Sequence, residues 1–104
     1  MDGQGLKLGL KIGVLTLELQ IPGCASLKDK RSRLKPLLSR LHREFNISVA
    51  EVDHLDAWQA AVIACAIVSN DVAHSQRLLQ QVVQWLENNW PDIEIVDHKI
   101  EIIS

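Results

Sequence analysis

The sequence predicts an α+β domain of the ferredoxin-like kind, a βαββαβ sandwich with a four-stranded antiparallel sheet and two helices on one face. Two observations predict it. Segments with the apolar pattern of strands and segments with helical periodicity follow one another as strand, helix, strand, strand, helix, strand. The chain has 104 residues, of which 47% are hydrophobic, enough for one core of ordinary size and a single domain.

The first core strand is expected at Val14–Ile21, where apolar residues alternate with small or polar ones. Upstream of Gly13 the apolar positions are even-numbered, and downstream of it they are odd-numbered. Because a shift of one residue turns side chains to the opposite face of a sheet, we predict a bulge or bend near Gly13. Residues 1–12 are therefore interpreted as an N-terminal extension, and residues 13–104 as the domain.

Two amphipathic helices are predicted. The first begins after the N-cap Ser26, and Asp29 follows three residues later, close to a capping-box arrangement. Pro36 lies within this helix, so we expect either a kink or a regular helix that begins only near Lys35. The second helix follows the capping segment 69–71.

The remaining strands are predicted at 46–53, 58–68 and 93–103. The segment 58–68 is apolar on both faces, which is typical of a central or doubly covered strand. Two helices cover only one face of such a sheet, so large apolar residues on the open face would form an interface patch. Ile63, Cys65 and Ile67 are the candidates for this patch, which would serve protein–protein interaction or dimerisation, with a homodimer as the expected partner. The alternative is that only small residues face outward.

Basic residues are concentrated in the first predicted helix. The segment from Lys28 to Arg43 holds seven of the eleven Lys and Arg residues and one acid, although the net charge of the chain is −2. Cations in a first helical turn oppose the helix dipole by about 0.3–1 kcal/mol each. An anion docked against the free backbone donors, such as an RNA phosphate, would explain them. The candidate contacts are Lys28, Lys30, Arg31 and Arg33.

A solvated helix face that binds nothing is the alternative interpretation. On a helical wheel the basic residues spread around the outer side, and Arg31 alone falls near the apolar seam. Stacking of RNA on the sheet surface is not supported, because the two central strands carry no internal aromatic residue. Any RNA or ribosomal contact is therefore expected to be electrostatic, with little reading of sequence.

A second, weaker candidate is the cluster Asp53, His54 and Asp56 in the predicted hairpin connection. It could act as an acid–base pair or an incomplete metal site, or the carboxylates could simply bond their own backbone at a turn. Metal-ligand spacings such as HExxH are absent from the sequence. We therefore expect a non-enzymatic binding module without metal or cofactor.

The chain is expected to be cytoplasmic. Its first residues lack the basic start and apolar core of a secretory signal, and no apolar run reaches the roughly 18 residues of a membrane span. Cys24 and Cys65 are the only cysteines, which is weak support for an oxidising compartment.

The chain resembles the YlxP-like family, a bacterial domain of unknown function. The resemblance rests on Val14–Leu19, Ile21-Pro22-Gly23, Ser26–Arg31, Val49–Asp53, Trp58-Gln59 and Ser69-Asn70-Asp71, which follow in order over residues 12–103. It implies a ferredoxin-like fold and brings no accepted activity. The genes of this family often lie near genes for translation and ribosome maturation, which implies work on RNA.

Overall fold

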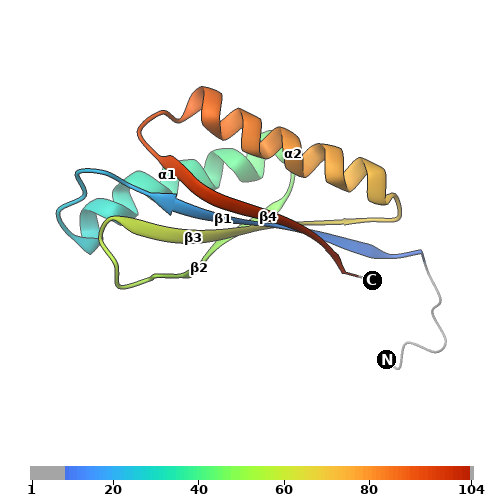
Figure 1. Cartoon of the computed structure of the whole chain (residues 1–104), viewed down its shortest axis with the longest axis horizontal. Helices are drawn as coiled ribbons and strands as arrows, with labels where there is room; N and C mark the ends of the chain where they lie inside the picture. Colours follow the sequence, from blue (N-terminus) through green and yellow to red (C-terminus); the bar gives the residue numbers. More distant parts are fainter. Residues whose placement is uncertain (1–8, 104) are drawn as a thin grey trace.

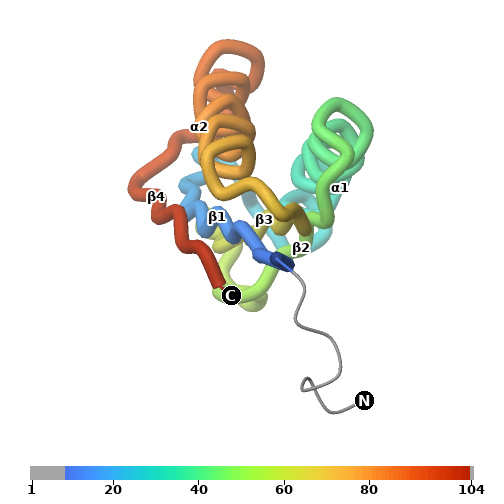
Figure 2. The backbone as a smooth tube through the Cα atoms, turned by 90° about the vertical axis from the view of Figure 1, so that its right-hand side faces the viewer, coloured from blue at the N-terminus to red at the C-terminus, as the bar shows by residue number. Residues whose placement is uncertain are grey.

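The computed structural model describes residues 9–103 of the chain. The elements follow in the order β1 (Lys11–Gln20), α1 (Leu27–Phe45), β2 (Ser48–Asp53), β3 (Ala60–Ser69), α2 (Val72–Asn89) and β4 (Glu94–Ile103). The strands form one antiparallel sheet in the order β2-β3-β1-β4. Both helices lie on the same face of this sheet, and the other face is open (Figure 1, Figure 2). The predicted ferredoxin-like fold is confirmed.

The core lies between the sheet and the two helices. Its fully buried side chains come from β1, α1, β3 and α2, and include Leu15, Leu17, Leu19, Leu37, Leu41, Ile63, Cys65, Leu79 and Val82. The first helix lies over β2, and the second lies over β1, β3 and β4. Neither helix combines the length and the apolar character that a membrane span needs, within residues 9–103.

The prediction of a bulge near Gly13 is wrong, and the alternative of a bend there stays a prediction. The pairing of β1 with β3 runs without interruption from Lys11 opposite Ser69 to Gln20 opposite Ala60. The register shift of β1 lies instead between Glu18 and Leu19, on the β4 side. The strand also begins at Lys11, inside the segment interpreted as an extension. Residues 1–8 of that extension lie outside the described part of the chain.

The burial of Gly13 explains why the apolar positions change from even-numbered to odd-numbered at this point of the sequence. It is buried on the helix-covered side, where an added Cβ would lie 3.1 Å from Leu79 Cδ1 and 3.2 Å from Ser75 Cβ. A close approach of α2 therefore leaves no room for a side chain at this position. Ile12, the apolar residue directly before Gly13, lies on the open face.

The caps of both helices are as predicted. Ser26 Oγ accepts a hydrogen bond from the Asp29 backbone N–H at 3.0 Å, and Asp71 Oδ1 accepts one from His74 N–H at 3.1 Å. The first helix is continuous through Pro36, so the alternative start near residue 35 is wrong. A kink at Pro36 stays a prediction.

The proposed interface residues of β3 point toward the helices and not toward the open face of the sheet. Ile63 and Cys65 are fully buried on the helix-covered face, and Ile67 packs against the same core. The reason is the register: Cys65 lies opposite Leu15 and Ile63 opposite Leu17, so they share the face of these core residues. The prediction that these three residues form an exposed patch is wrong.

Candidate functional site

The basic residues of α1 divide into a buried one and an exposed group. Lys30 is 1% exposed, and its Nζ lies 2.7 Å from Glu51 Oε2. The same ammonium donates hydrogen bonds to the carbonyl oxygens of His54 and Ala57 at 2.8 Å and of Ala60 at 2.9 Å. Lys30 is therefore occupied within the chain, and its prediction as an anion contact is wrong.

The position of Lys30 on the helix explains its burial. It precedes Leu34, Leu37 and Leu41 at spacings of four, three and four residues, so it lies on the buried stripe of α1. Arg31, which the helical wheel placed near the apolar seam, is exposed. The signal that locates Lys30 is this spacing, together with an acid at position 51 of a neighbouring strand.

The guanidinium of Arg33 also forms its hydrogen bonds within the chain. Its Nη1 donates to the Pro22 carbonyl at 2.7 Å and lies 3.5 Å from Cys24 Sγ, while Nη2 donates to the Asp92 carbonyl at 3.5 Å. The side chain thus joins α1 to the loops before α1 and before β4. Arg33 is a poor candidate for an anion contact, because its donors already have partners.

Apart from Arg40, which pairs with Glu44, four exposed cations remain on the solvent side of α1. We call Lys28, Arg31, Lys35 and Arg43 the basic face. They lie away from the buried stripe, and within residues 9–103 no carboxylate lies within ion-pair distance of them.

Neither acid of α1 neutralises this face. Asp29 accepts a hydrogen bond from the Ala25 backbone N–H at 3.1 Å. Glu44 lies 3.7 Å from Arg40, whose guanidinium also stands over the Trp85 ring. The basic face therefore carries positive charge without a local counter-charge, and two of its members, Lys28 and Arg31, lie in the first turns of the helix.

The open face of the sheet has the opposite character. Glu18 of β1 lies opposite Asp97 of β4, and Glu101 lies nearby on the same strand, 3.8 Å from Lys99. These side chains border a shallow groove of about 260 Å³ that also includes Thr16. An anionic ligand is disfavoured on this surface, so the charges of the molecule separate onto two sides.

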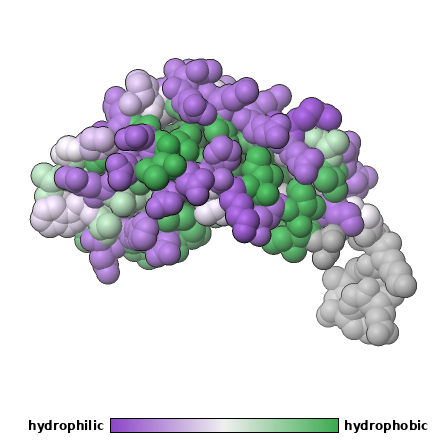
Figure 3. Space-filling view, in the orientation of Figure 1, coloured by the Kyte–Doolittle hydropathy of each residue, from purple (hydrophilic) through white to green (hydrophobic). Residues whose placement is uncertain are grey.

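One end of the open face is apolar. Ile12 lies opposite Val68 on one side and Ile103 on the other, and we call these three residues the apolar end. Val68 is 65% exposed and Ile103 is 53% exposed. Figure 3 shows hydrophobic residues at the surface toward the end of the molecule at which β4 ends. This surface replaces Ile63, Cys65 and Ile67 as the apolar candidate for an interface.

The cluster Asp53, His54 and Asp56 is exposed at the hairpin connection. Asp53 Oδ1 accepts a hydrogen bond from the His54 backbone N–H at 2.7 Å, and His54 has a φ of 57°. Nowhere in residues 9–103 do three His, Cys, Asp or Glu side chains gather closely enough to hold a metal ion. The carboxylate of Asp53 supports the turn, and the acid–base alternative stays a prediction.

Comparison with known proteins places the chain in a family. The model of the family described as "Protein of unknown function (DUF503)" matches residues 12–100, and the chain belongs to this family. The uncharacterized protein YlxP of Bacillus subtilis (strain 168) is 35% identical over 83 residues, which is 80% of this chain and 89% of that protein. The resemblance to the YlxP-like family is therefore confirmed.

Two solved structures share the fold. The protein NE2512 from Nitrosomonas europaea, of unknown function, has a TM-score of 0.53 at 15% identity, covering 90% of this chain and 87% of its own. The de novo designed protein Foldit4 has a TM-score of 0.52 at 14% identity, covering 91% and 97% respectively. At these identities the similarity shows the fold alone.

Proposed function

We propose that this domain is a non-enzymatic cytoplasmic binding module that contacts RNA, free or in ribosomal particles, through the basic face of α1. The observation that supports it is the exposure of Lys28, Arg31, Lys35 and Arg43 on one side of a helix without ion-pair partners among the described carboxylates. The acids of the open sheet face favour the same orientation, because they repel phosphates from the opposite surface.

The proposed contact is mainly electrostatic. Lysine and arginine side chains that neutralise phosphates release condensed counterions, so the logarithm of the binding constant falls linearly with the logarithm of the salt concentration. Four phosphate contacts give a slope of about −3 to −4 on duplex RNA, taking the B-DNA coefficient as a guide. Such contacts position the protein and carry little sequence information.

The test is the salt dependence of RNA affinity, measured by fluorescence anisotropy. Lys35→Glu on the basic face is expected to weaken binding and to reduce the salt slope by about 1, because one phosphate contact is lost. Arg77→Glu is the matched control, since Arg77 is an exposed cation on α2. Absent binding, a salt-independent affinity, or equal effects of the two substitutions would reject the proposal.

A second candidate function is self-association through the apolar end. The observation that favours it is the direct adjacency of Ile12, Val68 and Ile103 in register, with the last two more than half exposed. Contiguous exposed apolar side chains commonly mark interfaces. This candidate uses a different surface from the basic face, so the two functions are compatible in one molecule.

A further inference from the structure

The strand β4 forms one edge of the sheet, and no other element of residues 9–103 lies on its outer side (Figure 2). An edge strand presents backbone N–H and C=O groups without partners, so it can pair with a strand of another chain. The edge strand β2 has six residues, and its register shifts between Glu51 and Asp53. Short length and distortion protect an edge from such pairing. β4 has ten residues, so it is the edge more suited to a partner strand.

The regular part of β4 is the segment 97–103. Asp97 and Ile95 lie opposite consecutive residues of β1, so Val96 is the extra residue of a bulge. From Asp97 to the end of the strand the pairing with β1 continues without a shift. Ile100 is the central residue of this segment. Two copies that pair antiparallel over its whole length are therefore related by a two-fold axis at Ile100.

The charges of this segment match in that register. Lys99 of one copy lies opposite Glu101 of the other, and the two-fold axis repeats the pair. Within one chain these side chains are 73% and 47% exposed. Opposite charges directly across an antiparallel ladder stabilise it, and like charges destabilise it. A shift by two residues would place Lys99 opposite its own copy in one direction and Glu101 opposite its own copy in the other. The charge pattern therefore selects the centred register.

The helix-covered side of the segment is mainly apolar. In the same register Ile100 meets its own copy, and Ile102 lies opposite His98. Within the chain Ile100 lies opposite the core residue Leu15, so the seam between two copies would border both cores. Ile100 and Ile102 are only partly buried. Pairing would cover more of their apolar surface, which favours association.

We infer that a second copy of this chain pairs with the first through the β4 edges, antiparallel and centred on Ile100, so that one sheet continues through both copies. The backbone groups of the two edges then bond each other, and Lys99 pairs with Glu101 across the axis. Because the axis is perpendicular to the sheet, the helices of both copies lie on the same side. The inference is independent of the proposed contact with RNA.

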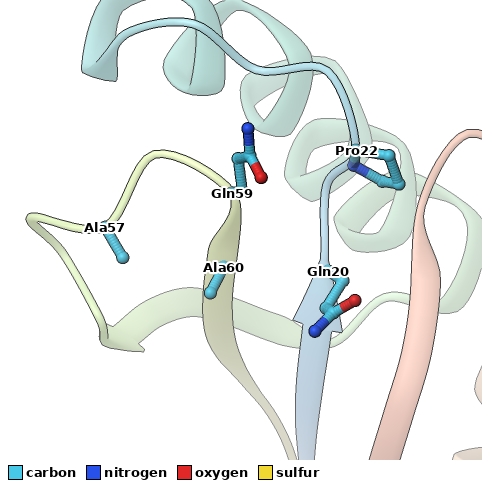
Figure 4. Close-up of a pocket in the computed structure, with 5 residues that line it drawn as sticks. All are labelled: Gln20, Pro22, Ala57, Gln59 and Ala60. Atoms are coloured by element: carbon cyan, nitrogen blue, oxygen red, sulfur yellow. The ribbon is translucent and has the colours of Figure 1, made fainter.

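The pairing leaves the other surfaces of each copy accessible. The basic face lies on α1, which packs over β2 at the opposite edge of the sheet. The apolar end stays uncovered, because a strand added beside β4 covers no part of the open face. A pocket of about 330 Å³ between β1 and β3 also stays open (Figure 4); it is lined by Gln20, Pro22, Ala57, Gln59 and Ala60. The β4 edge is thus a contact surface separate from those of the proposed functions.

The experiment is an exchange of charges, with the dissociation constant of the dimer measured by sedimentation velocity. Lys99→Glu and Glu101→Lys, each alone, are expected to raise this constant about 10-fold or more, because opposite-charge pairs become like-charge pairs. The double variant with both substitutions should recover the affinity of the parent protein. Glu94→Lys is the matched control and should leave the constant unchanged, since Glu94 is an exposed acid of β4 that precedes the bulge.

A mixture of the two single variants separates a contact between copies from an effect within one chain. Lys99 and Glu101 also lie 3.8 Å apart in the same copy, and each single variant loses that ion pair. In the mixed dimer every acid at these two positions faces a base of the other copy. The mixture should therefore associate as tightly as the parent protein, although each of its components alone associates weakly.

A parent protein that is monomeric at all concentrations would overturn the inference. Single variants that associate as tightly as the parent protein would do the same, as would a mixture that stays as weak as its components. A dimer that Val68→Glu dissociates, while the charge substitutions leave it intact, would also overturn the inference and would assign the contact to the apolar end.

Discussion

Lys30 Nζ lies 2.7 Å from Glu51 Oε2, and this ion pair joins the start of α1 to β2. The same ammonium also donates hydrogen bonds to three backbone carbonyls, so the buried charge is surrounded by oxygen acceptors. A buried charge of this kind is well compensated when all its partners are present. Removal of one partner leaves a buried charge uncompensated, which lowers the stability of the fold.

Lys30→Met is expected to lower the free energy of unfolding by about 3 kcal/mol, because Glu51 loses its partner and three carbonyls lose their donor. Urea denaturation followed by circular dichroism measures this. Lys28→Met is the control, and its effect should stay within about 0.5 kcal/mol, since Lys28 is exposed. Equal stabilities of the two variants would contradict the assigned role of Lys30.

Gly13→Ala is expected to destabilise the domain by about 1–3 kcal/mol, although alanine is otherwise no worse than glycine in a strand. The added Cβ would lie 3.1 Å from Leu79 Cδ1 and 3.2 Å from Ser75 Cβ, so α2 must shift. Thermal or urea unfolding checks this. Gly9→Ala is the control, because the nearest atom to its added Cβ is 4.0 Å away. A Gly13→Ala variant as stable as the parent protein would show that α2 does not pack this closely against Gly13.

The stability of the domain is expected to fall above pH 9 because of Cys65. Burial raises the pKa of this thiol from 9.0 to about 12. Between these values the unfolded chain has released the proton while the folded chain retains it, so unfolding becomes more favourable as the pH rises.

The comparison variant is Cys65→Ala, which shares every other titrating group. Between about pH 9 and about pH 10.5, the parent protein should lose about 1–2 kcal/mol of unfolding free energy relative to this variant. Urea titrations of both proteins at the two pH values give the difference. A constant difference would mean that Cys65 is as accessible to water when folded as when unfolded.

Val68→Glu tests the apolar end as a self-association surface. If two chains associate there, the new carboxylate should shift the protein from dimer to monomer in sedimentation velocity, because a charge would be buried without a partner. Val52→Glu is a suitable control, since Val52 is 52% exposed on β2, away from the apolar end. A parent protein that is monomeric at all concentrations would remove this candidate function.

The order of elements and the helix caps were predictable, because periodicity and capping are local properties of the chain. Ser26 and Asp71 act as caps as predicted. The faces of β3 were not predictable in the same way. Both faces of this strand are apolar, so only its pairing with β1 decides that Ile63 and Cys65 lie under the helices.

The site was predicted only in part, for a similar reason. The concentration of basic residues on α1 follows from the sequence, but which of them faces the solvent depends on how the helix is rotated over β2. Lys30 can occupy the buried stripe because its ammonium forms an ion pair with Glu51 and donates hydrogen bonds to the hairpin carbonyls. Arg33 is occupied by loop carbonyls that are distant in sequence, including that of Asp92. Long-range partners of this kind leave no local signal.

A nuclear magnetic resonance titration with RNA tests the central proposal most directly. Addition of a short RNA duplex to isotope-labelled protein should shift the amide signals of Lys28, Arg31 and Lys35, while those of Thr16 and Lys99 on the open face stay unchanged. The shifts should diminish as salt is added. Shifts confined to the open face, or absent from α1 at a saturating RNA concentration, would contradict the account.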